Sequence, residues 1–275
     1  MSLTLATCQP SSSADPRSNG AEARRMLRKA AAAGARLAHF PEGFVSGYAV
    51  ADVADWDDVD WSDVRDELEQ LATLAGELGI WVVVGSAHRL TAPHRPHNSL
   101  YVISDDGRLV DRYDKRKCSH TEISRFYTPG FEPVVFDVDG FRFGLATCIE
   151  VNFPELFSEY ARLGVDCVLL SAYPVDSIFV TLARAHAAIN TCWLSLSVPA
   201  QTTHLFRSQL VGPHGAALAE AGAEAGLVVG SLDRADPALH VALDLARPWR
   251  ASARDGQIYE VRRVADERSR VSTAF

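Results

Sequence analysis

The sequence predicts an α/β protein in which helices cover a mixed sheet or a pair of sheets. Helix-like stretches alternate with short apolar runs rich in β-branched residues, which is typical of buried strands. Hairpin turn signals interrupt this alternation, so the chain is not a pure array of parallel β-α-β units. No linker or low-complexity segment divides the 275 residues, and we therefore expect a single domain over 1–275.

The first half of the chain contributes two expected helices. The helix over 19–33 is rich in alanine and arginine and is expected to end at Gly34. The helix over 62–78 carries an apolar stripe with spacings of three and four residues. Strands are expected at 2–10, 35–40, 80–86, 99–104 and 108–113. The last two of these are expected to form a hairpin around an Asp-Asp-Gly turn.

The second half repeats this mixture. Helices are expected over 153–163 and 177–190. Hairpins are expected around Asp139-Gly140 and around 212–215. The expected strands lie at 133–138, 141–147, 165–171, 192–198 and 226–232. The tail from about residue 235 is expected to be irregular and contains the basic stretch RPWRASAR.

Composition excludes several classes of protein. The formal net charge of −8 argues against nucleic acid as the main partner, because phosphate binding needs a basic face. No apolar run reaches the roughly 20 residues that span a bilayer, and the first ten residues do not resemble a signal peptide. The five cysteines are scattered without zinc-type spacing, which favours reduced thiols, no structural metal and a cytoplasmic location.

Three polar residues stand directly after expected strands, where α/β enzymes place their working groups. They are Glu42, Lys115 and Cys148. Taken singly, each is ordinarily a loop carboxylate, a surface lysine or an inert buried thiol. Together they form a chemically complete set: a carboxylate can take the proton of a thiol, and a lysine can stabilise the oxyanion that forms when the thiol attacks carbon.

These residues lie in segments that resemble the nitrilase superfamily of carbon–nitrogen hydrolases. The segments are FPEGFVSGY (40–48), RYDKRKCSHTE (112–122) and TCIEVNFPE (147–155), in the family's order. Weaker similarities extend the resemblance over most of the chain, at 97–115, 182–190 and 208–222.

The resemblance implies a four-layer αββα sandwich whose subunits pair through helices, so a homodimer or higher homo-oligomer is expected. It implies neither a metal nor an organic cofactor. The implied reaction is hydrolysis of a non-peptide carbon–nitrogen bond in a small molecule, through a cysteine thioester with release of ammonia or an amine. A second glutamate of the family is matched by Glu122.

The resulting hypothesis assigns a role to each matched residue. Glu42 is the base, Cys148 the nucleophile, and Lys115 holds the oxyanion together with the backbone N–H of Ile149. Glu122 positions the substrate or tunes Glu42. The pocket lining is expected to include Tyr48 and Tyr173. Glu150 is a rival base that shares a face with Cys148 in an extended stretch, although the family gives this position a supporting role.

The substrate class follows from one neighbour of the cysteine. Nitrile-hydrolysing relatives often carry tryptophan directly after the cysteine, whereas this chain has Ile149, which favours an amide. Hydrolysis of N-carbamoyl compounds or of nitriles remains an alternative, as does a non-catalytic binding protein on the same fold. The chain departs from the family pattern at Asn152, at Arg116-Lys117 and at 187–190, which lacks a common glutamate.

Overall fold

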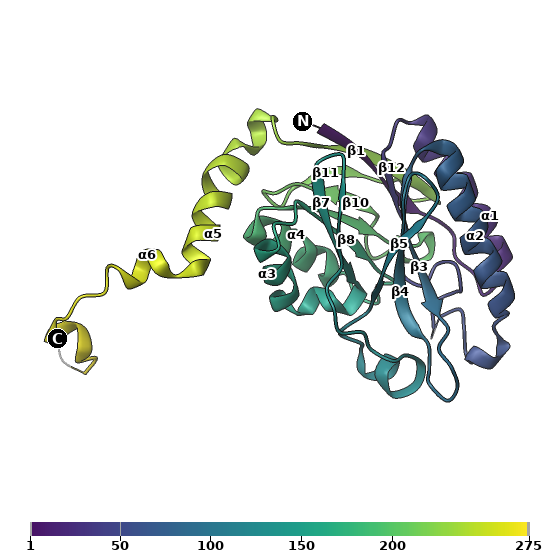
Figure 1. The fold of residues 1–275 in the computed structure, drawn as a ribbon, viewed down its shortest axis with the longest axis horizontal. Helices are drawn as coiled ribbons and strands as arrows, with labels where there is room; N and C mark the ends of the chain where they lie inside the picture. Colours follow the sequence, from purple (N-terminus) through teal and green to yellow (C-terminus); the bar gives the residue numbers. More distant parts are fainter. Residues whose placement is uncertain (1, 50, 274–275) are drawn as a thin grey trace.

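Two six-stranded sheets pack face to face, with helices on both outer faces (Figure 1). The structure, a computed structural model, describes residues 2–49 and 51–273. The expected αββα sandwich is thereby confirmed, and the choice between one mixed sheet and two sheets is settled in favour of two.

The first sheet combines a parallel centre with antiparallel edges. Strands β1, β2 and β3 run parallel, and β12, β4 and β5 are antiparallel to their neighbours. In spatial order the strands are β12 (Gly226–Asp233), β1 (Ser2–Gln9), β2 (Leu37–His39), β3 (Trp81–His88), β4 (His97–Ile103) and β5 (Leu109–Asp114). Its outer face packs against α1 (Pro16–Ala32) and α2 (Trp61–Leu78).

The second sheet has the same plan. Strands β7, β8 and β9 are parallel, and β6, β10 and β11 complete the sheet in antiparallel pairs. In spatial order they are β11 (Ala217–Glu220), β10 (Gln209–Val211), β9 (Trp193–Ser197), β8 (Cys167–Ser171), β7 (Phe141–Thr147) and β6 (Val135–Val138). Helices α3 (Pro154–Arg162) and α4 (Ile178–Asn190) cover its outer face.

The sheets are buried on both faces, which explains the nearly continuous apolar runs in the sequence. In β1, for example, Leu5 packs between the sheets while the next residue, Ala6, packs against the helices. Full burial of a leucine contributes about 1.5–3 kcal/mol, so three such apolar layers account for much of the stability of the fold.

Local signals at the helix ends explain where the helices begin and stop. The first helix starts at Pro16, three residues before its expected start, because the Asp15 carboxylate accepts the first free N–H groups of the helix. The second begins after Asp60, which caps it in the same way, and ends at Gly79 with a left-handed backbone. Short helical turns occur at η1 (Trp56–Asp58), η2 (Glu122–Phe126), η3 (Cys148–Asn152) and η4 (Ala200–Thr202).

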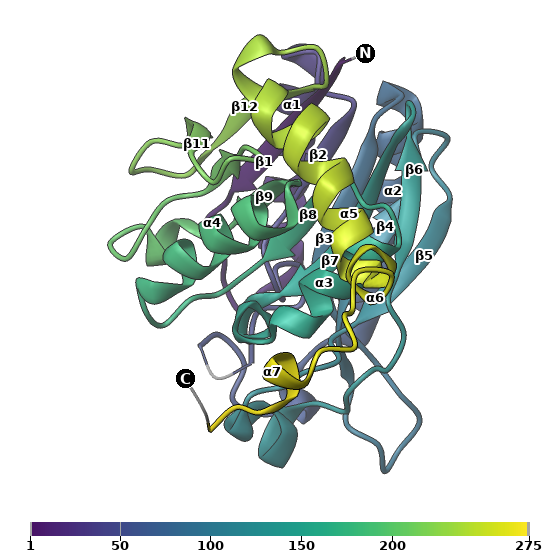
Figure 2. The ribbon, with the colours of Figure 1, turned by 90° about the vertical axis from the view of Figure 1, so that its left-hand side faces the viewer.

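The segment after residue 235 contains more regular structure than the irregular tail expected from the sequence. It forms η5 (Pro237–Leu239), η6 (Val241–Ala246), α5 (Arg247–Asp255), α6 (Gln257–Glu260) and α7 (Glu267–Arg270). Figure 2 shows α5 on the outer side of the layer formed by α3 and α4. Beyond α5 the chain extends away from the layered body (Figure 1). Within the described residues, no helix is long and apolar enough to cross a membrane.

Candidate active site

The chain segments that follow three strands meet at one point between the two sheets. Glu42 follows β2 and Lys115 follows β5, both in the first sheet, while Cys148 follows β7 in the second. All three side chains are buried. Glu42 and Lys115, which are 73 residues apart, meet at one end of the first sheet. The hydrogen bond from the Lys117 N–H to Glu150, 33 residues later in the chain, joins this end to the turn after β7 of the second sheet.

Lys115 lies between two carboxylates. Its Nζ donates to Oε1 of Glu42 and to Oε1 of Glu122, each at 2.7 Å. Burial alone would lower the pKa of this lysine, but the two carboxylates outweigh burial and raise the pKa well above its ordinary value. The ammonium group is therefore charged at any physiological pH.

The two carboxylates on Lys115 differ in basicity. Burial raises the pKa of Glu42, even though Lys115 and the Asn98 amide, which donates at 2.8 Å, act in the opposite direction. Burial also acts to raise the pKa of Glu122, but Lys115 and the backbone N–H of Ser119, at 2.7 Å, overcome it and lower that pKa. Glu42 is thus the more basic carboxylate and Glu122 the more persistent anion.

Cys148 lies at a sharp turn where β7 becomes η3. Its backbone adopts φ = +47°, a left-handed conformation that is rare for residues other than glycine and is often found at functional turns. Its thiol donates to the Tyr173 carbonyl oxygen at 3.6 Å. Burial, followed by the nearby Glu42 carboxylate, raises the pKa of the thiol well above its ordinary value. The resting cysteine is therefore a neutral thiol that needs a base in order to react.

The Tyr173 backbone connects the base and the thiol. Its N–H donates to Oε2 of Glu42 at 3.0 Å, and its carbonyl oxygen accepts from Cys148. The Tyr173 ring stacks on Tyr48 with centroids 4.9 Å apart, and the Tyr48 hydroxyl donates to Glu122 at 3.3 Å. The two tyrosines expected to line the pocket are therefore both in contact with the carboxylate–lysine cluster.

Glu150 ties the cysteine turn to the lysine segment. One carboxylate oxygen accepts the backbone N–H groups of Arg116 and Lys117 at 2.8 and 2.9 Å, and the other accepts that of Thr147 at 2.7 Å. The Tyr113 hydroxyl donates to the same carboxylate. With all these donors around it, Glu150 is committed to holding the backbone on both sides of the site, which fits a supporting role better than that of a base.

The departures from the family pattern have local partners. Arg116 pairs with Glu159 at 2.6 Å, and the Lys117 ammonium lies 5.9 Å from the centre of the Phe153 ring. The Asn152 amide donates to the Ile149 carbonyl oxygen at 3.1 Å and thereby closes the turn that follows Cys148. The side chain of Asn190, in the segment 187–190, accepts from Arg254 of α5 at 2.9 Å.

The structure also adds two groups that were absent from the predicted site. Asn98 donates to Glu42, and the Tyr173 backbone contacts both Glu42 and Cys148. Asn98 is the second residue of β4 and lies within the segment 97–115 that supported the resemblance, so its position was a usable signal. Among the residues that the structure describes, no group of three or more histidine, cysteine, aspartate or glutamate side chains is arranged to hold a metal ion.

A lysine between two carboxylates beside a strained, buried cysteine is the arrangement of a hydrolase with a cysteine nucleophile. Comparison with known families supports that class: the model of the carbon-nitrogen hydrolase family matches residues 4–238. The chain belongs to the carbon–nitrogen hydrolase family.

Individual relatives resemble this chain over most of its length. Human omega-amidase NIT2 is 27% identical over 252 residues, which cover 84% of this chain and 89% of the relative. The 2-oxoglutaramate amidase of Bacillus subtilis is 26% identical, over 70% of this chain and 76% of the relative. An amidase from Nesterenkonia sp. has the same fold, with a TM-score of 0.74 and 23% identity over 90% of this chain and 96% of its own.

Proposed function

We propose that this carbon–nitrogen hydrolase cleaves the amide of a small molecule through a thioester on Cys148 and releases ammonia. One observation carries the proposal: Lys115 is held at 2.7 Å by both Glu42 and Glu122, next to a buried thiol that cannot ionise without a base. The amidase relatives support an amide as the substrate class.

In the first half of the reaction, the Cys148 sulfur attacks the amide carbon while its proton passes to Glu42. The carbonyl oxygen becomes an oxyanion, which the Lys115 ammonium and the backbone N–H of Ile149 stabilise. Ile149 is suited to this because it lies in the first turn of η3, where N–H groups have no partner within the turn. The carbon–nitrogen bond then breaks, and Glu42 returns the proton to the departing nitrogen, which leaves as ammonia.

In the second half, Glu42 takes a proton from a water molecule, and the hydroxide attacks the thioester carbon. The carbon–sulfur bond breaks, the sulfur regains a proton from Glu42, and a carboxylic acid leaves. The net reaction is amide plus water to carboxylic acid plus ammonia. The raised pKa of Glu42 suits both proton transfers, because a more basic carboxylate accepts the thiol proton more readily.

Glu122 acts in this scheme as a positioning residue. Its carboxylate stays ionised and accepts from Lys115, so the ammonium stays charged while Glu42 gains and loses protons. The substrate lies against the stacked rings of Tyr48 and Tyr173 in this scheme, since both tyrosines contact the carboxylate–lysine cluster.

The test is an assay of ammonia release from a panel of primary amides, including ω-amides of dicarboxylic acids, together with N-carbamoyl compounds and nitriles. We expect activity on amides, and a loss of at least about a thousandfold in Cys148→Ala. Cys118→Ala is the matched control, since Cys118 is also partly buried near the site but is not the nucleophile, and should keep most of the activity. Full activity in Cys148→Ala, or activity on nitriles alone, would contradict the proposal.

We further propose that the chain works as a homodimer in the cytoplasm. Apolar side chains that are half exposed on α4, α5 and α6 support the dimer, among them Ile189, Trp249 and Tyr259. All five cysteines are free thiols, which fits a reducing compartment. Light scattering should give twice the mass of one chain, and a monomer at all micromolar concentrations would contradict the dimer.

A further inference from the structure

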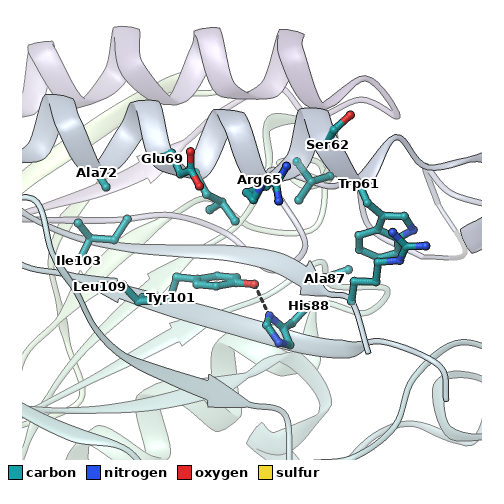
Figure 3. Close-up of a pocket in the computed structure, with 13 residues that line it drawn as sticks. Trp61, Ser62, Arg65, Glu69, Ala72, Ala87, His88, Tyr101, Ile103 and Leu109 are labelled. Carbon is teal, nitrogen blue, oxygen red and sulfur yellow. Dashed lines mark hydrogen bonds between the residues drawn. The ribbon is translucent and has the colours of Figure 1, made fainter. Parts of the chain in front are cut away.

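A groove that is separate from the cysteine site lies between α2 and the outer face of β4 (Figure 3). Its volume is about 500 Å³, within the range of pockets that take small organic molecules. At one end the walls are apolar, formed by Ala72 of α2, Ile103 of β4 and Leu109 of β5. None of the residues proposed for catalysis lines it.

The other end carries a hydrogen-bond donor for which the described residues provide no acceptor. His88 Nε2 lies 2.7 Å from Nη1 of Arg112, which can only donate, so Nε2 must be the acceptor. The imidazole proton is therefore on Nδ1, which lies 2.7 Å from the Tyr101 hydroxyl and donates to it. The hydroxyl of Tyr101 is left with its own proton to give.

Burial of both side chains supports these protonation states, a neutral His88 and a protonated Tyr101 hydroxyl. Tyr101 is only 8% exposed, and burial raises the pKa of its phenol to about 12, so the hydroxyl keeps its proton. Burial and the adjacent Arg112 lower the pKa of His88, which keeps the imidazole neutral with a single proton. In Figure 3 the Tyr101 hydroxyl lies on the side of the groove that faces Arg65 and Trp61.

Positive charge surrounds the same end. Arg65 of α2 and Arg89 after β3 line the groove, and neither forms an ion pair with any residue that the structure describes. Arg89 lies over the Trp61 ring at 5.8 Å, which holds its guanidinium at the groove wall. The one acidic side chain in the lining, Glu69, is exposed and lies one helical turn from Arg65 toward the apolar end.

We propose that this groove binds a small organic carboxylate with an apolar body. The carboxylate accepts the free proton of Tyr101 and pairs with Arg65 and Arg89, while the apolar body lies along Leu68, Ile103 and Leu109. A neutral imidazole, an unshared hydroxyl proton and two arginines favour an anion, whereas the apolar far end disfavours a simple inorganic ion.

The probe is octanoate, titrated by calorimetry into the Cys148→Ala protein so that turnover plays no part. We expect saturable binding with one site per chain, and about tenfold weaker binding in Tyr101→Phe, which removes only the donor. The double variant Arg65→Ala with Arg89→Ala should weaken binding by at least about tenfold. Glu69→Gln should tighten it, because a repelling charge is removed.

The controls separate this site from non-specific binding. Arg28→Ala removes an exposed arginine of α1 outside the groove and should leave the affinity unchanged. Octylamine, with the same chain and the opposite charge, should bind at least about tenfold more weakly than octanoate. Equal binding of the two probes, or unchanged octanoate affinity in Tyr101→Phe, overturns the proposal whether or not the protein is an amidase.

Discussion

At the scale of single residues, two glutamates share one lysine and yet differ in their readiness to take a proton. The pKa of Glu42 is raised because burial outweighs its contacts with Lys115 and Asn98, whereas the pKa of Glu122 is lowered because Lys115 and Ser119 outweigh burial. In our scheme this difference divides the work: Glu42 moves protons, and Glu122 keeps the lysine charged.

The substitution Glu122→Gln tests this division. The negative charge of Glu122 raises the pKa of Glu42, so its removal lowers that pKa. Since Glu42 must be unprotonated to act as a base, the acidic limb of the pH profile of kcat/KM should move to lower pH. At pH 7.5 we expect kcat to fall by about a hundredfold, because Lys115 loses one of its two anchors.

The matched control is Glu155→Gln, which changes an exposed glutamate at the start of α3 and should leave the profile in place. A profile of Glu122→Gln that keeps its acidic limb and only loses amplitude would mean that Glu122 has a purely structural role.

The residues of the candidate site could be predicted from the sequence only as far as local motifs reach. Glu42, Lys115, Cys148 and Glu122 each stand in a recognisable segment after a strand or at a turn, and the structure brings them together. The contribution of the Tyr173 backbone to the site could not be predicted, because every residue type except proline supplies the same N–H and carbonyl groups. Only the tertiary fold directs these groups toward Glu42 and Cys148.

At the scale of elements, the Glu150 side chain holds the turn after β7 and the segment after β5 together. Every polar neighbour of the Glu150 carboxylate is a donor: three backbone N–H groups and the Tyr113 hydroxyl. A glutamine here would turn its NH₂ group toward at least one of these donors. Glu150 therefore fixes the relative placement of the two segments through a carboxylate specifically.

We predict that Glu150→Gln lowers the free energy of unfolding by about 1–3 kcal/mol, the cost of leaving a buried donor without an acceptor. Urea unfolding followed by circular dichroism measures this. Activity should fall more steeply than stability suggests, since Lys115 and Cys148 lose their common support. Glu150→Gln with unchanged stability and unchanged kcat would refute the bridging role.

The helix α5 is attached to the body through arginines. Arg250 donates to the carbonyl oxygens of Ala188 and Ile189, and Arg254 donates to Ile189 and Asn190 at 3.0 and 2.9 Å. The backbone carbonyls of Ala188 and Ile189 lie at the C-terminal end of α4, where a helix carries partial negative charge, and the Asn190 acceptor is its side-chain oxygen. The sequence indicated an irregular tail because the partners of these arginines lie some 60 residues earlier and are mostly backbone atoms, so no local pattern in the tail reveals them.

The double variant Arg250→Ala with Arg254→Ala should loosen α5 without unfolding the sandwich. The lost hydrogen bonds and charge interactions amount to about 1.4 kcal/mol, so amide hydrogen exchange in 247–255 should rise about tenfold. Exchange in β1 and β8 should not change. Arg262→Ala, in the extended tail, is the control, and equal effects of both variants would contradict the specific attachment of α5.

At the scale of the whole molecule, the two sheets are joined by polar as well as apolar contacts. His39 of β2 lies between Ser195 of β9 and Ser171 of β8, each at 2.8 Å. Ser171 gives its own proton to the Phe40 carbonyl oxygen, so it must accept from Nε2 of His39. Thr7 of β1 completes the network through Ser195 at 2.7 Å. Apolar patterns sufficed to predict strands and outer helices, but they left the number of sheets open because they do not show which strand faces which. Only the resemblance to the family implied two sheets.

This network predicts how the stability of the protein depends on pH. Burial lowers the pKa of His39 to about 3, so the folded state keeps a neutral imidazole while the unfolded chain titrates near 6.5. Below pH 6.5 the unfolded state therefore binds one more proton at this site, and the stability that His39 contributes is lost as the pH falls. From pH 7.5 to 5.5 the free energy of unfolding should decrease by about 1.4 kcal/mol on account of His39 alone.

In His39→Gln this part of the pH dependence should disappear, and stability at pH 7.5 should be lower by about 1–3 kcal/mol because the serines lose a partner. Exposed His204→Gln is the matched control and should keep the wild-type slope. Urea unfolding of the three proteins at both pH values measures the difference, and parallel curves for wild type and His39→Gln would show that His39 is not the group that couples sheet pairing to pH.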